Sequence, residues 1–131
     1  MSVTKQILIV ENNQTLRELL EFLLSREGYQ VKTVSDGDYA QKELRENPSY
    51  HLIILDLLLP IITGRQLLRW IRRTTQINHI PILVLTDLQD EDDIASALDE
   101  GANDYVIKPF QPKELQARIR KLLQIKRSSQ E

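Results

Sequence analysis

The sequence predicts an α/β fold in which helices cover both faces of a parallel sheet. Short apolar segments rich in β-branched residues alternate with longer segments whose apolar residues recur at helical spacing. Five such pairs follow one another along 131 residues, a length that suits one domain. Near-continuous apolar strands are typical of a parallel sheet buried on both faces. Together these observations predict a doubly wound (βα)5 sandwich.

Three strands and two helices are predicted in the first half of the chain. Asn12 or Asn13 can cap the first helix, and Gly28 is the kind of residue that ends one. The Asp-Gly pair at 36–37 is typical of a turn, and Pro48 closes the second helix. The predicted strands are 6–10, 29–34 and 51–56, the first helix has leucines at 16, 19, 20, 23 and 24, and the second helix is 39–47.

The second half of the chain continues the alternation with three helices and two strands. Each helix has one apolar face that we expect to point inward, and Gly101 ends the middle helix. The predicted strands are 80–86 and 105–107, and the predicted helices are 64–73 (Leu67, Leu68 and Ile71 inward), 90–100 (Ile94, Ala97 and Leu98 inward) and 113–125 (Leu115, Ile119, Leu122 and Leu123 inward). Because residues 126–131 are polar and lack periodicity, we expect one domain over 1–125 and a tail or the start of a linker over 126–131.

The composition argues against several classes of protein. The sequence contains no cysteine, which excludes a disulfide framework and fits a reducing cytoplasm. The first ten residues lack the regions of a signal peptide, and the longest apolar run, 52–62, is broken by Asp56 and Pro60. The formal net charge is −2, whereas a nucleic-acid-binding domain usually has a basic excess. We therefore expect a cytoplasmic domain that binds neither membrane nor nucleic acid directly.

Polar residues follow four of the predicted strands at their carboxyl ends. Glu11 and Asn12 follow the first strand, Asp56 ends the third, Thr86 ends the fourth, and Lys108 follows the fifth. In open parallel sheets, ligands bind beyond the carboxyl ends of the strands, where the strand order reverses. Right-handed crossovers leave few topologies, and in the order 2-1-3-4-5 the first and third strands are neighbours. Glu11 and Asp56 would then face each other from separate strands.

These residue types suit phosphoryl chemistry assisted by a metal ion. Carboxylate and carbonyl oxygens suit a hard cation such as Mg²⁺. Asp56 can act as a nucleophile on phosphorus, because carboxylates form acyl phosphates. Lys108 supplies a compact positive charge near the phosphoryl oxygens, and the Thr86 hydroxyl can donate to one of them. Each residue alone is more often a helix cap or a surface side chain, so their joint placement is what favours the functional interpretation.

Four segments at these positions resemble a known family. They are ILIVENN at 7–13, LDLLLP at 55–60 with the following Gly64, VLT at 84–86 and GANDYVIKPF at 101–110. On these segments the chain resembles the receiver domain of bacterial two-component response regulators, over about residues 5–123. The resemblance implies a flavodoxin-like sheet of order 2-1-3-4-5. It also implies a phosphorylation-dependent switch, not an enzyme beyond self-phosphorylation and self-dephosphorylation, with a histidine kinase or phosphotransfer protein as donor.

The resemblance assigns the metal and phosphoryl roles to particular residues. Asp56 would be the phosphoacceptor, and Lys108 would contact the phosphoryl oxygens. Glu11, Asn12 and Asp56, with the backbone carbonyl of Leu58, would hold Mg²⁺.

The switch residues are implied in the same way. Thr86 would move toward the phosphoryl group, and Tyr105 would rotate inward as the space behind Thr86 changes. The bond between Lys108 and Pro109 would be cis, a form that is readily accessible only before proline.

Two residues depart from the pattern of the family. The second acid of the metal site is replaced by Asn12, whose neutral amide oxygen is a weaker ligand for a hard cation, so we expect weakened Mg²⁺ binding and slow phosphorylation. The residue after Thr86 is usually small, but here it is Asp87, which could oppose an incoming anion or supply a replacement carboxylate. Asp87 and Leu88 are therefore the residues that we expect to modulate the site.

The segment 103–119 resembles receivers that are joined to winged-helix DNA-binding domains. Those receivers dimerise through the fourth helix, fifth strand and fifth helix, with ion pairs across the subunits. Asp104 and Arg118 match one such pair, whereas isoleucines at 94 and 125 replace basic residues and leave Glu114 without its expected mate. Exposed ion pairs contribute only about 0–1 kcal/mol each, so a homodimer through this face is still expected.

A pseudo-receiver is the first alternative. It would have the same fold and act as a protein-binding module without phosphoryl transfer. Asn12 and Asp87 favour this alternative, whereas Asp56, Thr86 and Lys108 oppose it.

An enzyme on a similar sheet is the second alternative. A flavin or dinucleotide protein would have a glycine-rich phosphate loop after the first strand, and residues 11–15 contain no glycine. A phosphatase with an aspartyl nucleophile would have a second acid two residues after Asp56, where Leu58 stands.

Overall fold

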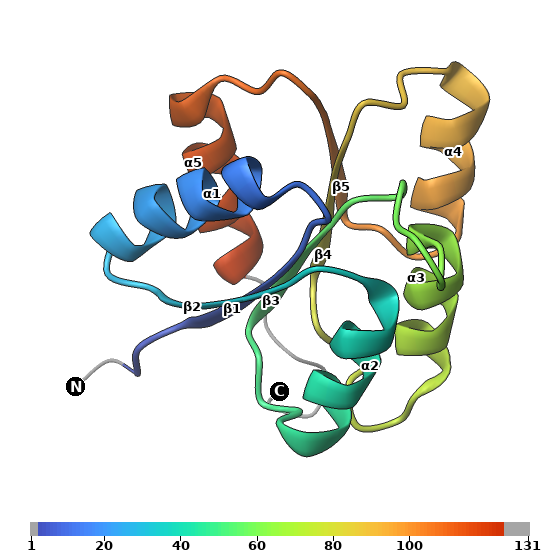
Figure 1. The fold of residues 1–131 in the computed structure, drawn as a ribbon, viewed down its shortest axis with the longest axis horizontal. Helices are drawn as coiled ribbons and strands as arrows, with labels where there is room; N and C mark the ends of the chain where they lie inside the picture. Colours follow the sequence, from blue (N-terminus) through green and yellow to red (C-terminus); the bar gives the residue numbers. More distant parts are fainter. Residues whose placement is uncertain (1–2, 125–131) are drawn as a thin grey trace.

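A five-stranded parallel sheet forms the centre of the structure, a computed structural model that describes residues 3–124. The strands lie in the order β2-β1-β3-β4-β5, so β1 has β2 on one side and β3 on the other. Figure 1 shows α1 and α5 on one face of the sheet and α2, α3 and α4 on the other. The predicted doubly wound sandwich and its strand order are confirmed.

The strands begin and end close to their predicted positions. β4 is the exception, because it begins at Ile82 and not at residue 80. Pro81 has no N–H to donate, and the Ile80 N–H donates to the Ile77 carbonyl at 3.1 Å in a turn. The strands are Gln6–Val10 (β1), Gln30–Val34 (β2), Leu52–Leu55 (β3), Ile82–Thr86 (β4) and Asp104–Ile107 (β5).

Side chains cap the first three helices. The Asn13 side chain accepts the Leu16 N–H at 2.9 Å, so Asn13 and not Asn12 caps α1. The prediction of a turn at 36–37 is wrong, because the Asp36 side chain accepts the Tyr39 N–H at 2.9 Å and α2 begins at Gly37. A capping box stabilises the first turn of α3. The helices are Gln14–Arg26 (α1), Gly37–Glu46 (α2), Gly64–Arg73 (α3), Glu91–Asp99 (α4) and Pro112–Leu123 (α5).

Glycines follow α1 and α4 at the predicted places. Gly28 has φ 93° and Gly101 has φ 122°, a left-handed conformation that glycine adopts without steric cost. No helix within residues 3–124 has the length and apolar character needed to cross a bilayer. The predictions for Ile125 and for the tail at 126–131 lie outside the described residues.

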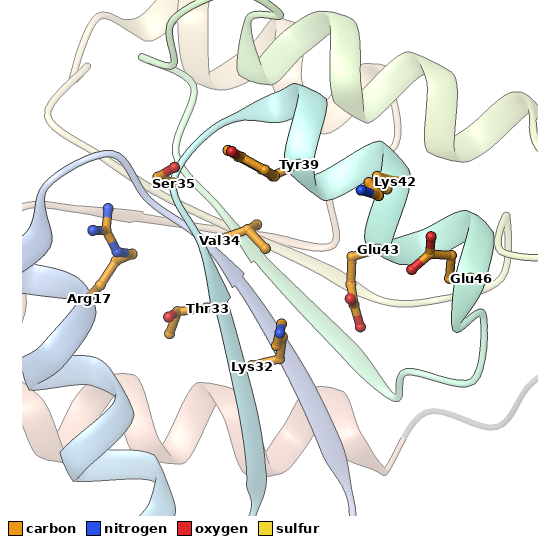
Figure 2. A pocket seen from close by; sticks show the side chains of 9 residues that line it. All are labelled: Arg17, Lys32, Thr33, Val34, Ser35, Tyr39, Lys42, Glu43 and Glu46. Carbon is orange, nitrogen blue, oxygen red and sulfur yellow. The ribbon is translucent and has the colours of Figure 1, made fainter.

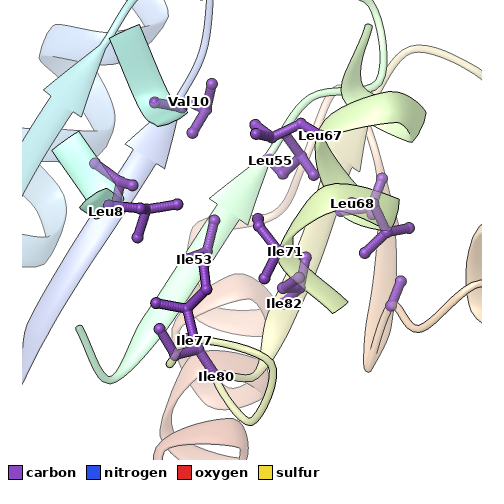
Figure 3. Packing of buried hydrophobic residues seen from close by; sticks show 14 of the residues in the cluster. Leu8, Val10, Ile53, Leu55, Leu67, Leu68, Ile71, Ile77, Ile80 and Ile82 are labelled. Carbon is purple, nitrogen blue, oxygen red and sulfur yellow. The ribbon is translucent and has the colours of Figure 1, made fainter. Parts of the chain in front are cut away.

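Two apolar clusters fill the space between the sheet and its helix layers. One lies under α2, α3 and α4 and includes Leu8, Ile53 and Leu68, which Figure 3 shows with other members of the cluster. The other lies under α1 and α5 and includes Ile9. Neighbouring residues of β1 enter opposite clusters, as the pleat of a strand requires. The predicted inward position of Leu98 is wrong, because Leu98 is 42% exposed and α4 buries Ala97 alone.

Candidate functional site

The carboxyl ends of β1, β3, β4 and β5 bring polar side chains to one edge of the sheet. The backbone ladder continues past the strand ends: the Asp56 N–H donates to the Val10 carbonyl at 3.1 Å, and the Lys108 N–H donates to the Thr86 carbonyl at 2.8 Å. Asp56 and Thr86 are buried, as is Glu11. The sheet therefore fixes where each of these side chains begins.

Lys108 lies between two carboxylates. Its Nζ is 2.7 Å from Asp56 Oδ2 and 2.9 Å from Glu11 Oε1. The Lys108 side chain is 13% exposed and each carboxylate side chain is 5% exposed. The structure thus brings together three of the predicted site residues, from β1, β3 and β5. Because all three groups are largely removed from water, their close contact offsets part of the cost of burying them.

Backbone amides hold the other oxygen of each carboxylate. The Leu58 N–H donates to Asp56 Oδ1 at 2.9 Å, and the Asn13 N–H donates to Glu11 Oε2 at 3.0 Å. Each carboxylate is therefore fixed from two sides, by an amide and by the Lys108 ammonium. A fixed polar arrangement of this kind needs little reorganisation when charge changes at the site.

Burial and mutual charge shift the protonation of this cluster. Burial raises the pKa of the Glu11 carboxyl above its ordinary value and the charge of Asp56 adds to this, although hydrogen bonds from Lys108 and the Asn13 amide oppose it. Burial works to lower the pKa of Lys108, but its hydrogen bonds to Asp56 and Glu11 outweigh burial and raise the pKa overall. Lys108 therefore stays an ammonium at neutral pH, and Glu11 loses its proton less readily than an ordinary glutamic acid does.

Thr86 and Tyr105 use their hydroxyl groups differently. The Thr86 hydroxyl is fully buried and has no hydrogen-bond partner among residues 3–124. The Tyr105 hydroxyl donates to the Leu88 carbonyl at 2.7 Å. Burial raises the pKa of Tyr105, and Asp93 and Asp56 raise it further. Thr86 thus has an unused donor, whereas the donor of Tyr105 is held by the loop between β4 and α4.

The two departures from the family pattern lie outside this cluster. Asn12 is exposed, and its Nδ2 donates to the Ser35 carbonyl at 3.3 Å. Asp87 is exposed and Leu88 is half-buried. Within residues 3–124, no hydrogen bond or ion pair joins Asn12 or Asp87 to Asp56.

The donor set at the sheet edge fits a hard divalent cation. In the described part of the chain, no group of three or more acidic, histidine or cysteine side chains could hold a metal ion. A site here would therefore combine the carboxylates of Glu11 and Asp56 with amide, carbonyl or water oxygens. Mg²⁺ is commonly bound in this way, by one or two carboxylates and several waters.

Two further residues shape the site. Arg17 Nη1 donates to the Glu11 carbonyl at 2.8 Å and to the Asn12 carbonyl at 2.9 Å, although the sequence analysis did not single out Arg17. A cation near the start of a helix is unfavourable because it opposes the helix dipole. The position of Arg17 in α1 was therefore the one feature of the sequence that could have indicated a partner outside the helix. Gly64 starts α3 so close to the site that a Cβ there would lie 2.2 Å from the Asp56 carbonyl oxygen. The position of Gly64 therefore excludes any side chain.

A family model for the response regulator receiver domain matches residues 7–120. The chain belongs to this family. Receiver domains are phosphorylation-dependent switches of two-component systems, interact with histidine kinases and generally bind Mg²⁺ at the phosphorylation site. Response regulators are generally not classed as enzymes. The predicted family is confirmed.

Curated relatives of this receiver include transcriptional regulators. The transcriptional regulatory protein GltR of Pseudomonas aeruginosa is 48% identical over 120 residues, which cover 91% of this chain and 49% of GltR. The phosphate regulon transcriptional regulatory protein PhoB of Escherichia coli is 38% identical over 121 residues, which cover 92% of this chain and 52% of PhoB. The chain thus spans about half the length of the curated relatives it matches. The pseudo-receiver alternative gains no support from these relatives.

Solved receiver structures have the same fold. A response regulator from Chloroflexus aurantiacus has a TM-score of 0.87 and 35% identity, covering 92% of this chain and 98% of that chain. The BeF3-activated N-terminal receiver domain of RstA from Klebsiella pneumoniae has a TM-score of 0.85 and 30% identity, covering 92% of this chain and 100% of that chain. The Lys108–Pro109 peptide bond of the present receiver is cis, as expected.

The three residues of the expected dimer face pair within one chain. Arg118 Nη1 lies 3.1 Å from Asp104 Oδ2, and Arg118 Nη2 lies 2.9 Å from Glu114 Oε2. The hydrogen bonds that Arg118 donates to Glu114 and then to Asp104 raise the pKa of Arg118. Glu114, which is expected to lack a mate across subunits, has Arg118 as a partner on its own helix.

Proposed function

We propose that Asp56 is the phosphoacceptor of this receiver and that Lys108 and Thr86 detect its phosphorylation. The contact that supports this most directly is the 2.7 Å ion pair between Lys108 Nζ and Asp56 Oδ2. It places a cation where phosphoryl oxygens on Asp56 would need one, in a site from which water is largely excluded.

The reaction is a phosphoryl transfer from a phosphohistidine. A carboxylate oxygen of Asp56 attacks phosphorus, a P–O bond forms, the P–N bond of the donor breaks, and the imidazole leaves with the electron pair of that bond. Lys108 neutralises charge on the transferred group, and the amide of Leu58 keeps the carboxylate oriented through Oδ1. Positioning and charge neutralisation are the main requirements of this chemistry.

Mg²⁺ would be held by Glu11, Asp56, Asn12 and the carbonyl of Leu58. When bound, the cation neutralises the carboxylates and the phosphoryl oxygens together. Because Asn12 supplies a neutral amide and its Nδ2 already bonds to Ser35, we propose that the site binds Mg²⁺ more weakly than a site with two acids. Asp87 is exposed, and we propose that it and Leu88 adjust the rate of transfer.

The unpartnered hydroxyl of Thr86 supplies the switch. Phosphoryl oxygens on Asp56 would give this buried donor the acceptor that it lacks, and that gain would favour the state in which Thr86 reaches them. Tyr105 would change position with Thr86, because its hydroxyl is bonded to Leu88, two residues after Thr86. The face formed by α4 and β5 would then present a different surface to partners.

The phosphoryl donor, a histidine kinase or phosphotransfer protein, would dock beside the site on α1. A groove of about 350 Å³ there is lined almost wholly by apolar atoms, and Lys108 lies at its edge. Leu19, which is 45% exposed, belongs to this lining. The other lining residues are Leu16, Leu23, Pro109, Phe110 and Pro112.

We place the receiver in the cytoplasm, joined to a DNA-binding output domain and acting as a homodimer. The output domain is suggested by relatives that are transcriptional regulators twice as long as the match. The dimer would use the face that carries Asp104, Glu114 and Arg118. Sedimentation with and without beryllofluoride would show whether activation changes the mass of the particle.

Intact-mass measurement after treatment with acetyl phosphate and Mg²⁺ tests the assignment of Asp56. We expect one phosphoryl group on the protein, none on Asp56→Asn, and one on the matched control Asp99→Asn, which changes an exposed carboxylate of α4. An adduct that survives Asp56→Asn would remove Asp56 from its role. A protein that takes up no phosphoryl group and does not respond to beryllofluoride would instead be a pseudo-receiver.

A further inference from the structure

A polar hollow lies at the β2 edge of the sheet, between α1 and α2. Its volume is about 480 Å³, which is within the range of small-ligand sites. Figure 2 shows that its lining comes from β2 in the centre, α2 on one side and Arg17 of α1 on the other. The lining residues are Arg17, Lys32, Thr33, Val34, Ser35, Tyr39, Lys42, Glu43 and Glu46.

Three cations of the hollow have no acid partner. Among residues 3–124, no carboxylate lies within 4.0 Å of a charged nitrogen of Arg17, Lys32 or Lys42. Arg17 uses one nitrogen to bond to two backbone carbonyls, and its other N–H groups have no partner in the described structure. Three unpaired cations around one hollow favour an anion between them.

Two acids, Glu43 and Glu46, also line the hollow, and both belong to α2. Glu43 accepts a hydrogen bond from the Tyr50 hydroxyl at 2.5 Å, so its carboxylate is already engaged. In Figure 2 the Glu43 carboxylate and the Lys32 ammonium point in opposite directions along β2, with the ammonium directed toward Val34. The end of the hollow near Ser35, where Figure 2 shows Arg17 and Tyr39, contains neither acid.

Hydroxyl groups and an exposed aromatic ring lie at the end of the hollow near Ser35. Thr33 and Ser35 supply hydroxyl groups from β2, and neither hydroxyl has a partner within residues 3–124. Tyr39 is 58% exposed and brings both a ring and a phenol to the same end. Hydroxyl and ammonium donors together bind phosphate oxygens, and an exposed ring can stack on a base.

We propose that this hollow is a non-covalent binding site for a phosphate-bearing anion, held by Arg17, Lys32 and Lys42. A phosphate group has more acceptor oxygens than a carboxylate, so it can accept charge-assisted hydrogen bonds from more donors at once. The same chemistry could come from inorganic pyrophosphate or from a nucleotide, and a nucleotide would gain further from the Tyr39 ring. The site is separate from Asp56 and does not depend on its phosphorylation.

Arg17 joins this hollow to the phosphorylation site. The same guanidinium lines the hollow and donates to the carbonyls of Glu11 and Asn12. Asn12 in turn donates to the carbonyl of Ser35, which also lines the hollow. An anion bound to Arg17 would therefore perturb the loop that follows β1.

NMR titration of the ¹⁵N-labelled protein with pyrophosphate, then with ATP, tests the proposal. The titrations are run without Mg²⁺ and at constant ionic strength, so that general screening is held fixed. We expect saturable shifts of the amides of Lys32, Thr33, Ser35, Tyr39 and Lys42, with smaller shifts at Asn12. Inorganic triphosphate is titrated in the same way for comparison with ATP. Tighter binding of ATP than of triphosphate would identify a nucleotide as the ligand, and equal binding would identify the phosphate group alone.

Charge-removing variants test which side chains bind. Lys32→Gln and Lys42→Gln should each weaken pyrophosphate binding about tenfold, because each removes a charge-assisted contact. Lys113→Gln, which removes an exposed lysine from the start of α5, should leave binding unchanged.

Four results would overturn the proposal. One is a linear drift without saturation up to about 10 mM ligand, which corresponds to negligible affinity. Another is equal weakening by Lys113→Gln, which would indicate non-specific attraction. The third is a shift pattern centred on Thr86 and Lys108, which would mean that the anion binds at the phosphorylation site. Binding of a glutamate-rich peptide without binding of pyrophosphate would likewise replace the proposed ligand by an acidic protein segment.

Discussion

Two regions of this receiver use the same ionic geometry with opposite signs. At the sheet edge, the Lys108 ammonium bridges the carboxylates of Glu11 and Asp56. Between α3 and α4, the Glu100 carboxylate bridges two guanidinium groups, at 3.2 Å from Arg65 and 3.0 Å from Arg69. Side chains at the sheet edge are at most 13% exposed, whereas those of the second bridge are 25–42% exposed. The comparison separates the effect of burial from the effect of pairing.

The protonation of the acids shows which effect dominates in each region. Hydrogen bonds from Arg65 lower the pKa of Glu100; burial opposes this, and Arg69 lowers the pKa further. Burial raises the pKa of Glu11 despite its bond to Lys108. Pairing is therefore the larger influence on the pKa of the more exposed acid, Glu100, and desolvation is the larger influence on the pKa of the buried acid, Glu11. Buried charges held at a cost of this kind are typical of functional sites.

Removing the buried cation should have the largest effect. Lys108→Met leaves Glu11 and Asp56 close together in a site that is largely closed to water, so we expect the free energy of unfolding to fall by about 3 kcal/mol. Urea unfolding at pH 7 measures the change, and Lys113→Met on the surface of α5 is the control. If the two variants unfold at the same urea concentration, the bridge contributes nothing to stability.

Removing the unpartnered hydroxyl should have an effect of opposite sign. Thr86→Val keeps the shape of the side chain and deletes a buried donor that has no acceptor, so we expect the free energy of unfolding to rise by about 1 kcal/mol. We also expect beryllofluoride to change the spectrum of the parent protein but not that of Thr86→Val. A stability unchanged or lowered by this substitution would show that the hydroxyl is satisfied in solution.

Neutralising the buried acid gives a stability change that depends on pH. Because the folded pKa of Glu11 is raised, its contribution to stability is present below its ordinary value of 4.5 and is lost as the pH rises through the folded pKa. We therefore expect Glu11→Gln to be more stable than the parent at pH 7, by about 1 kcal/mol. The difference should shrink in acid, and thermal unfolding between pH 4 and pH 8 would show it. A difference that grows toward low pH would contradict the raised pKa.

Neutralising the exposed acid should have the smallest effect. Glu100→Gln should lower the free energy of unfolding by about 0.5 kcal/mol, because exposed pairs are weakened by hydration and side-chain entropy. High salt should remove this difference while leaving that of Lys108→Met largely intact. Denaturant melts of both variants at low and high salt measure the contrast directly. Equal salt sensitivity in the two regions would mean that burial does not distinguish them.

The sequence predicted the framework of this fold better than its details. Apolar runs and glycine stops place all ten elements, because a parallel sheet and its helices impose different periods on the chain. The start of β4 was misplaced because the apolar run extends back to Ile80, and the run alone does not show that the Ile80 N–H bonds to Ile77 in a turn. Leu98 was misplaced because helical spacing gives a direction, whereas the width of the buried stripe depends on how far α4 stands from the sheet.

The site was predictable where the topology alone brings residues together. Glu11, Asp56 and Lys108 follow strands that end at the same edge, so their convergence follows from the strand order. The contacts of Arg17 were not predictable, since a long side chain on a helix can turn in several directions. The bridge at Glu100 escaped notice for the same reason, because its partners lie on a different helix and share no pattern with it.

Gly64 gives the charged edge of the sheet a mechanical connection to α4. Its backbone lies so near the Asp56 carbonyl that no side chain fits between the two segments, and the Gly64 N–H donates to the Leu57 carbonyl at 3.0 Å. The next residue along α3 is Arg65, which donates hydrogen bonds to Ser96 and Glu100 of α4. A displacement at residue 56 can therefore reach a surface helix through a short chain of contacts. The first of these contacts requires that residue 64 has no side chain.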